Sequence, residues 1–153
     1  MSRRAAAGAL ALLGPWLIGC GEPPVRPVFP AGYAALYQEV RPCRHSADHD
    51  LNYVKVLADA AALAPYQGRA APFPKDAVVL KVEYLDDACA QLVGFTAMRK
   101  EAPGTASASN DWSWQKVDAQ RKVLESGQVE RCIGCHQACG RAPSAYDLTC
   151  AEP

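Results

Sequence analysis

The sequence lacks the features that define several common classes of protein. Its longest apolar stretch, residues 5–19, has 15 residues, whereas a membrane-spanning helix needs about 20. Lysine and arginine together number 16, as do aspartate and glutamate, so we expect no basic surface of the kind that binds nucleic acid. There is no self-similarity at the periods of about 20–50 residues that mark solenoids and propellers. These absences favour one globular domain of ordinary composition.

The N-terminus has the pattern of an export signal. Arg3 and Arg4 precede the apolar stretch, in the order that secretory signals use. The stretch ends with Leu-Ile-Gly-Cys at residues 17–20, which resembles the bacterial lipobox, whose cysteine is acylated and becomes the mature N-terminus. We therefore predict a lipoprotein signal peptide at residues 1–19 and lipidation of Cys20, which gives an exported bacterial lipoprotein anchored to a membrane on the periplasmic side. An ordinary signal peptide with an unmodified cysteine is the alternative.

The remaining chain reads as a short tether and one domain. Residues 20–30 are rich in proline and have no apolar period, which predicts an extended tether. Residues 31–153 form the predicted domain, which is long enough to bury a core. Its patterns predict an α+β fold with a mainly antiparallel sheet and a few short helices. The predicted strands are residues 51–57, 77–85, 90–100 and 112–117, and the predicted helices are residues 33–40 and 58–64.

The clearest of these strands is residues 77–85, Ala-Val-Val-Leu-Lys-Val-Glu-Tyr-Leu. Successive side chains of a strand point to opposite faces of the sheet. Val78, Leu80 and Val82 therefore share one face, whereas Lys81 and Glu83 share the other. The same rule places Trp112 and Trp114 on one face of a later strand, where we expect them to pack in the core or at a dimer interface.

Seven cysteines occur in the chain. One is the predicted lipid attachment site and two belong to the motif described next, which leaves an even number. An even remainder in an exported chain indicates two disulfides. Four cysteines allow three pairings. We favour Cys43 with Cys89 and Cys139 with Cys150, because the second pair closes a short loop beside the motif. The four candidates are Cys43, Cys89, Cys139 and Cys150.

Residues 132–136, Cys-Ile-Gly-Cys-His, form a C-x-x-C-H motif, the pattern of c-type haem attachment. Two thiols three positions apart lie on the same side of a helical turn, where each can bond one vinyl group of the porphyrin. The motif predicts one covalent haem c on Cys132 and Cys135, with His136 as the iron ligand. A zinc site is disfavoured because the chain has no second pair of ligands at suitable spacing. A thioredoxin-like redox pair is disfavoured because it needs a βαβ context.

The residue on the other side of the iron decides the function. A methionine ligand is typical of electron transfer, whereas an open position binds small molecules. Met98 is the only methionine after the predicted signal peptide, and a gap-filling methionine in the core is its favoured interpretation. His45 and His49 lie in a polar segment and are interpreted first as exposed loop residues, with a capping or pocket role as the second interpretation.

The order of several motifs resembles the cytochrome P-460 family over about residues 29–148. The resemblance depends on residues 72–74, 77–81, 98–104, 111–114, 127 and 132–136, and more loosely on residues 32–33 and 49–54. It implies a mainly antiparallel β fold, often dimeric, with a five-coordinate haem iron on His136. Family members include enzymes that oxidise hydroxylamine, and the related cytochromes c-prime-beta bind NO and CO.

The resemblance also implies a role for Lys81, which aligns with a lysine that is cross-linked to the porphyrin in the enzymes. A solvated lysine on a strand face is the alternative. Glu83, two residues further on, is its candidate ion-pair partner or a distal acid, and Asp111 is a second candidate for proton transfer. The expected partners are a small ligand (hydroxylamine, NO or CO), a redox partner cytochrome and a second copy of the chain.

Three functions stay open at this point. The first is an open-site haem protein that binds or oxidises a small nitrogen compound and passes electrons to another cytochrome. The second is a plain six-coordinate electron carrier, with Met98 or a histidine as the sixth ligand of the iron. The third is a gas-binding haem lipoprotein without enzymatic turnover.

Overall fold

A six-stranded sheet forms the framework of the protein in the computed structural model, which describes residues 24–139 and 146–150. Every strand pairs with the next one along the chain, and all five pairings are antiparallel. The strands are β1 (Gln38–His45), β2 (Tyr53–Ala58), β3 (Val78–Tyr84), β4 (Leu92–Lys100), β5 (Trp112–Asp118) and β6 (Val123–Gly127). The predicted mainly antiparallel α+β fold is confirmed.

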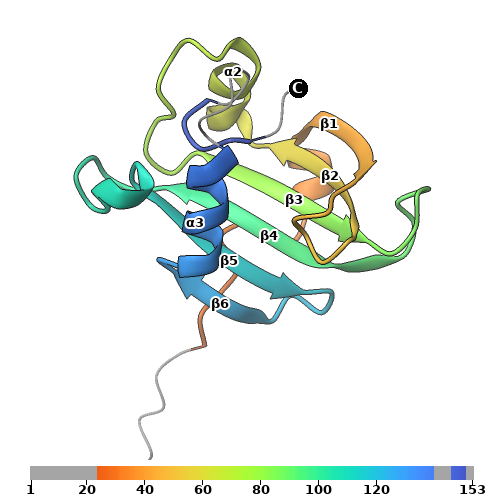
Figure 1. Cartoon of the computed structure of the whole chain (residues 1–153). Helices are drawn as coiled ribbons and strands as arrows, with labels where there is room; N and C mark the ends of the chain where they lie inside the picture. The colour runs from red at the N-terminus through yellow and green to blue at the C-terminus, as the bar shows by residue number, and fades with distance from the viewer. Residues whose placement is uncertain (1–23, 140–145, 151–153) are drawn as a thin grey trace, which may run out of the picture.

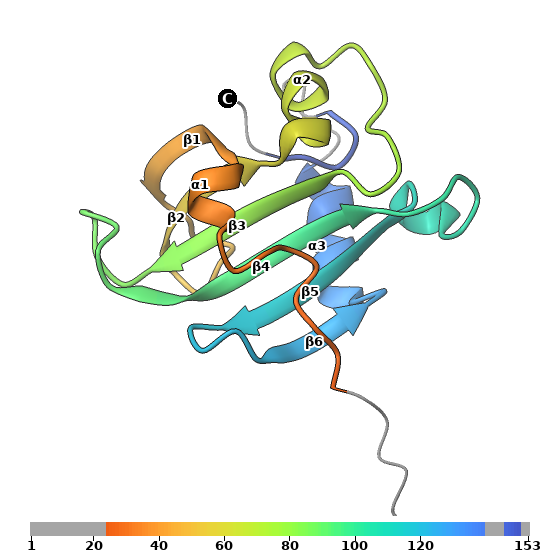
Figure 2. The ribbon, with the colours of Figure 1, turned by 180° about the vertical axis from the view of Figure 1, so that it is seen from behind.

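The helices lie on opposite sides of this sheet. Helix α3 (Glu130–Cys139) crosses one face (Figure 1), and α1 (Tyr33–Leu36) lies on the opposite face, which Figure 2 brings to the front. Helix α2 (Ala60–Gly68) sits at the end of the sheet beyond β2, with the side chain of Asp59 accepting a hydrogen bond from the backbone N–H of Ala62 at its start. A single turn of 3-10 helix (Ser107–Ser109) lies in the β4–β5 connection.

Both faces of the sheet are buried, so the alternative of a solvated face at Lys81 is wrong. Val78, Leu80 and Val82 pack in a cluster on the α1 side that includes Phe29 and Phe95. The second cluster lies on the α3 side and includes Val56, Val79, Met98, Trp112 and Trp114. Helix α3 contributes Ile133 and Cys132 to the edge of this second cluster. The sheet is therefore the middle layer between two apolar cores.

The predicted helix at residues 33–40 is wrong beyond its first turn, because residues 38–45 form strand β1. Pairing with β2 overrides the local helical period there. Pro42 is compatible with this edge strand, where the register against β2 shifts between Arg41 and Arg44. Helix α2 extends past the predicted end at residue 64, and β6 was not predicted.

The predicted signal peptide and Cys20 lie outside the described residues. The described part of the predicted tether, residues 24–30, runs across the back of the sheet (Figure 2). Gln115 accepts a hydrogen bond from the backbone N–H of Val28 and donates one to the carbonyl of Arg26, and Phe29 is buried against Phe95. Packing against the domain thus begins near Arg26.

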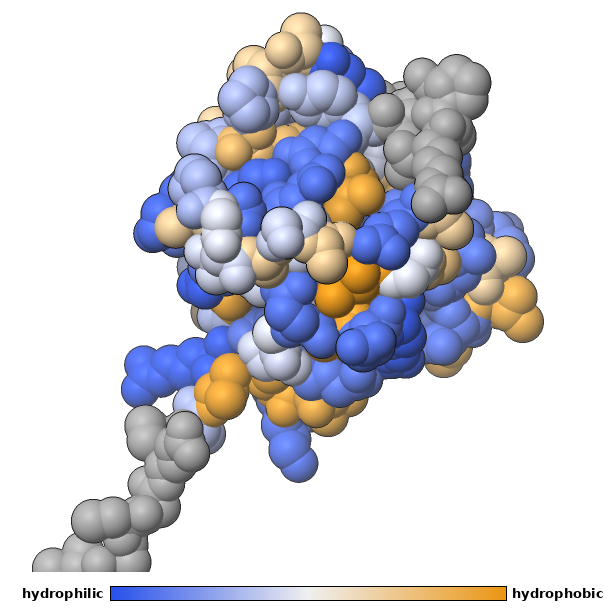
Figure 3. All heavy atoms as spheres, turned by 60° about the vertical axis from the view of Figure 1, so that its left-hand side comes forward, coloured by the Kyte–Doolittle hydropathy of each residue, from blue (hydrophilic) through white to orange (hydrophobic). Residues whose placement is uncertain are grey.

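Across residues 24–139 and 146–150, none of the helices combines the length and the apolar character that a bilayer crossing requires. The visible side of the molecule in Figure 3 is largely hydrophilic, with smaller hydrophobic patches between the polar residues.

Candidate functional site

The α3 face of the sheet changes from apolar to polar along the strands. Val79, Met98 and Trp114 form one row across β3, β4 and β5. The next row lies two residues away on each strand and consists of Lys81, Thr96 and Lys116. The polar row lies beneath the loop between β1 and β2, and this boundary between apolar and polar rows is where the candidate site lies.

Helix α3 carries the predicted attachment residues. Cys132 and Cys135 are free thiols, the first half-buried and the second exposed. They are three positions apart, which places them on neighbouring positions of one helix face. His136 follows in the last turn of α3 and is 6% exposed. The ring of Trp114 meets that of His136 edge to face at 5.7 Å between centroids.

A backbone carbonyl fixes the orientation of His136. Its Nδ1 lies 2.6 Å from the carbonyl oxygen of Leu148. A carbonyl only accepts, so Nδ1 carries the proton and the lone pair is on Nε2. Burial, with a smaller contribution from the charge of Lys81, lowers the pKa of His136 to about 4. The imidazole is therefore neutral at pH 7 and suited to bind a metal through Nε2.

The C-terminal segment that supplies this carbonyl is held at several points. Lys100 donates to the carboxylate of Asp147 at 2.7 Å, and the indole N–H of Trp112 donates to the carbonyl of Asp147 at 2.9 Å. Arg69 donates to the carbonyl of Thr149 at 3.3 Å. These contacts hold residues 146–150 at β4, β5 and the end of α2.

The two disulfides match the favoured pairing. Cys43 is bonded to Cys89, with 6.1 Å between their Cα atoms, and Cys139 to Cys150, with 5.3 Å. The first ties β1 to the β3–β4 turn, and the second ties the C-terminal segment to the end of α3. The sulfurs of the second disulfide lie close to His136. Because they are bonded to each other, they are not available as metal ligands.

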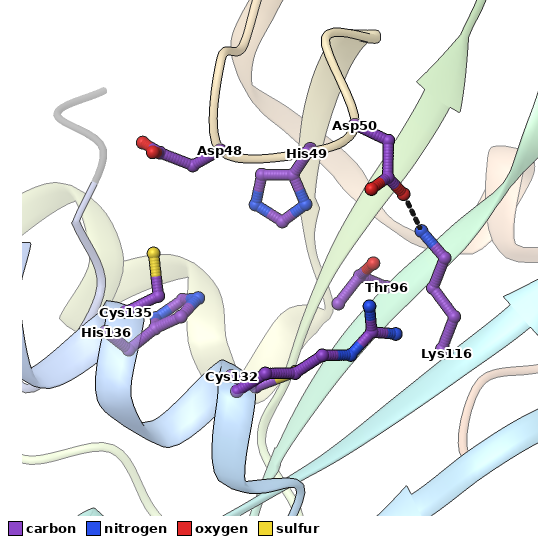
Figure 4. Close-up of a pocket in the computed structure, with 9 residues that line it drawn as sticks. Asp48, His49, Asp50, Thr96, Lys116, Cys132, Cys135 and His136 are labelled. Atoms are coloured by element: carbon purple, nitrogen blue, oxygen red, sulfur yellow. Dashed lines mark hydrogen bonds and ion pairs between the residues drawn. The ribbon is translucent and has the colours of Figure 1, made fainter.

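Two adjoining cavities lie between α3 and the β1–β2 loop. The larger is about 420 Å³ and the smaller about 150 Å³, and both are lined by Asp48, His49, Cys135 and His136. His49 enters from the loop above, and His136 from α3 below (Figure 4). Ligand pockets are commonly about 300–1,000 Å³, so the space between these two histidines is large enough for a small organic group.

His49 is held at both ring nitrogens. Its Nε2 lies 2.6 Å from Nζ of Lys81, and its Nδ1 lies 3.6 Å from Oε1 of Glu83. An ammonium group only donates, so Nε2 accepts and the proton of His49 lies on Nδ1, toward the carboxylate. Burial lowers the pKa of Lys81 to about 8, although the negative charge of Glu83 opposes part of this effect.

Glu83 lies one row beyond Lys81, Thr96 and Lys116, opposite Gly94 of β4, and has no exposed surface. Burial by itself raises the pKa of its carboxyl group, but the nearby Nδ1 of His49 and hydrogen bonds from Lys116 and Thr96 together lower the pKa to about 2. Lys116 lies 2.8 Å from the carboxylate, and Asn52 donates at 3.4 Å. Glu83 is therefore ionised and fully enclosed by donors.

Several predicted candidates have other roles in the described residues. Met98 is buried in the α3-side cluster, which agrees with the core interpretation. Trp112 and Trp114 belong to the same cluster. His45 is exposed as expected, at the edge of the larger cavity with its ring against Tyr53. Both carboxylate oxygens of Asp111 accept backbone N–H groups, from Gly104 and Ala106, and so support the β4–β5 connection.

Sequence reasoning missed the roles of His49 and of the C-terminal segment. The interpretation of His49 as an exposed loop residue is wrong, because its side chain is only 14% exposed and faces the cavity. Lys81 and Glu83 alternate with apolar residues, which was the available signal for a polar site under this loop. Nothing in the sequence around Leu148 marks a carbonyl acceptor, because every residue has one.

Neither a protein-family model nor a curated protein matches the chain.

We predict that Glu83→Gln destabilises the protein in a pH-dependent way. The folded pKa of about 2 lies below the ordinary value of 4.5. The stabilisation by the carboxylate is therefore complete above about pH 4.5 and is lost as the pH falls toward 2. We expect the free energy of unfolding to drop by on the order of 3 kcal/mol at pH 7, and the loss to shrink below pH 4.5, as measured by urea unfolding.

Glu39→Gln is the matched control, because Glu39 is exposed on β1 and its nearest cation, Lys55, is 3.9 Å away. It should change stability by less than about 0.5 kcal/mol at any pH. Equal pH profiles for wild type and Glu83→Gln would contradict the assignment of an ionised, stabilising Glu83.

Proposed function

We propose that the protein is an exported mono-haem lipoprotein of the cytochrome P-460 type, whose open iron site binds or oxidises a small nitrogen compound such as hydroxylamine or NO. Cys132 and Cys135 hold the porphyrin covalently, and His136 binds the iron through Nε2. A haem iron with one open position supplies reversible ligand binding and electron transfer. Electrons from oxidation of the ligand pass to a partner cytochrome.

The observation that carries this proposal is the hydrogen bond from Nδ1 of His136 to the carbonyl of Leu148. Metal-binding histidines commonly donate their other ring N–H to a carbonyl or carboxylate, which fixes the tautomer and raises the basicity of the ligand nitrogen. Here the same bond is made by a neutral, buried imidazole directly after two free thiols. Cys132, Cys135 and His136 all line the smaller cavity, which supports a macrocycle bound beside them.

An open position on the iron is supported by how the other candidate ligands are used. The two nitrogens of His49 face Lys81 and Glu83, so binding iron would disrupt that arrangement. The sulfur-bearing side chain of Met98 is 3% exposed within the α3-side core. These contacts favour the open-site function over the six-coordinate electron carrier.

Lys81 and His49 are the polar groups suited to handle a bound ligand. Both line the larger cavity, so the ammonium of Lys81 is placed to donate a hydrogen bond or a proton there. Glu83 lies behind His49 with no exposed surface. We therefore assign Glu83 a positioning role: it fixes the tautomer of His49 and leaves Nε2 as the acceptor for Lys81.

Covalent attachment is the first test of the proposal. Expressed with a haem-attachment system, the wild-type chain should retain haem on a denaturing gel and show a c-type spectrum in alkaline pyridine. We expect Cys132→Ala/Cys135→Ala to lose the gel-retained haem, because both thioether bonds are gone. The matched control is Cys43→Ala/Cys89→Ala, which removes two cysteines at a disulfide away from α3 and should keep it. A haem-free wild type would refute the proposal.

Turnover with hydroxylamine separates the enzyme from a gas-binding protein. We expect the wild type to reduce an artificial electron acceptor in the presence of hydroxylamine, and Lys81→Met to slow this by about 100-fold, the lower end for loss of an acid–base group. Lys55→Met is the control, because Lys55 lies on β2 with its ammonium over the ring of Tyr84. A narrower reduced Soret band in Lys81→Met would mark a covalent link between Lys81 and the porphyrin.

A wild-type protein that binds NO and CO but does not oxidise hydroxylamine would be a gas-binding protein and not an enzyme for this substrate. Equal turnover of Lys81→Met and wild type would remove Lys81 from the reaction.

A further inference from the structure

Basic side chains gather on one side of the larger cavity. Arg41 and Arg44 reach it from β1, and Lys81 from β3. His45 lies next to them at the cavity wall. Strand β1 is irregular here, since its register against β2 shifts between Arg41 and Arg44. Residues three positions apart point to opposite faces of a regular strand. Arg41 and Arg44 nevertheless line the same cavity.

These charges have little compensation within the cavity. Asp48 is the only acidic residue among the described residues that line it. Its carboxylate points away from the ring of His49 (Figure 4). Glu83 is paired with Lys116 and is not part of the cavity wall. The positive charges of Arg41, Arg44 and Lys81 therefore exceed the negative charge around them.

Arg41 also has an unused donor. Its Nε is buried and has no hydrogen-bond partner among the described residues. A buried donor without a partner is destabilising by about 1–3 kcal/mol, and such groups are rare in native proteins. An unpaired guanidinium nitrogen together with uncompensated positive charge indicates that an anion belongs at this place.

We propose that Arg41 and Arg44 bind the propionate carboxylates of the haem. This inference rests on the proposed function, because it assumes the porphyrin on Cys132 and Cys135. The planar guanidinium group matches a carboxylate with paired hydrogen bonds, and the cavity wall joins both arginines to Cys135 and His136. Arg41 and Arg44 would then hold the two carboxylates of the macrocycle where β1 lines the cavity.

The test compares Arg41→Gln, Arg44→Gln and the double variant with wild type as haem-loaded proteins. We expect the propionate bending bands in resonance Raman spectra to shift in each single variant and further in the double variant. The midpoint potential should fall, because removing positive charge beside the haem favours the oxidised iron. In a Cys132→Ala/Cys135→Ala background, each arginine change should weaken haem binding about tenfold, as loss of a charge-assisted hydrogen bond predicts.

Lys122→Gln is the control, because it removes one positive charge from an exposed position between β5 and β6. It should leave the Raman bands and the affinity for haem unchanged. Arg44 is exposed, so Arg44→Gln tests the proposal even where Arg41→Gln fails to fold.

The outcomes separate this inference from the proposed function. Covalent haem with unchanged propionate bands in Arg44→Gln and the double variant would overturn the propionate assignment alone. A wild type that carries no haem would overturn both. If the arginine changes instead weaken the binding of nitrite to the haem-loaded protein while the propionate bands stay fixed, the cluster holds a free anion and the assignment is wrong.

Discussion

The hydrogen bond between Nδ1 of His136 and the carbonyl of Leu148 is the interaction on which the site depends. It joins two parts of the chain that are separate in sequence, the last turn of α3 and the C-terminal segment. The Cys139–Cys150 disulfide ties the same two parts, and Asp147 connects that segment to β4 and β5. The sheet, the helix and the tail thus jointly set the tautomer of one imidazole.

A second constraint is the change of polarity along the α3 face of the sheet. The apolar row around Met98 supports the helix, whereas Lys81 and Lys116 of the polar row contact the β1–β2 loop at His49 and Asp50. Enclosing an ionised carboxylate requires several polar partners. His49 is one of the partners of Glu83, and this contact helps to hold its ring above the cavity. The proposed haem would lie between a covalently binding helix and a loop whose histidine is already engaged.

The sequence was informative for features that depend on local spacing and on residue counts. Alternation in β3 predicted which residues share each face and placed Lys81 and Glu83 together, and the cysteine count anticipated two disulfides. The β1 segment was misread because strand pairing outweighed a helical period over residues 33–40. His49, Leu148 and Arg41 could not be assigned from the sequence, because their roles come from segments brought together by the fold. Haem attachment, lipidation of Cys20 and the likeness to the cytochrome P-460 family stay predictions.

The absorption spectrum of the dithionite-reduced wild-type protein, recorded before and after addition of CO, tests the central claim most directly. A histidine-bound iron with an open position predicts a high-spin spectrum whose Soret band shifts when CO binds. Sharp low-spin bands that CO does not move would mean that a side chain occupies the sixth position. That result would contradict the open site and identify the protein as an electron carrier.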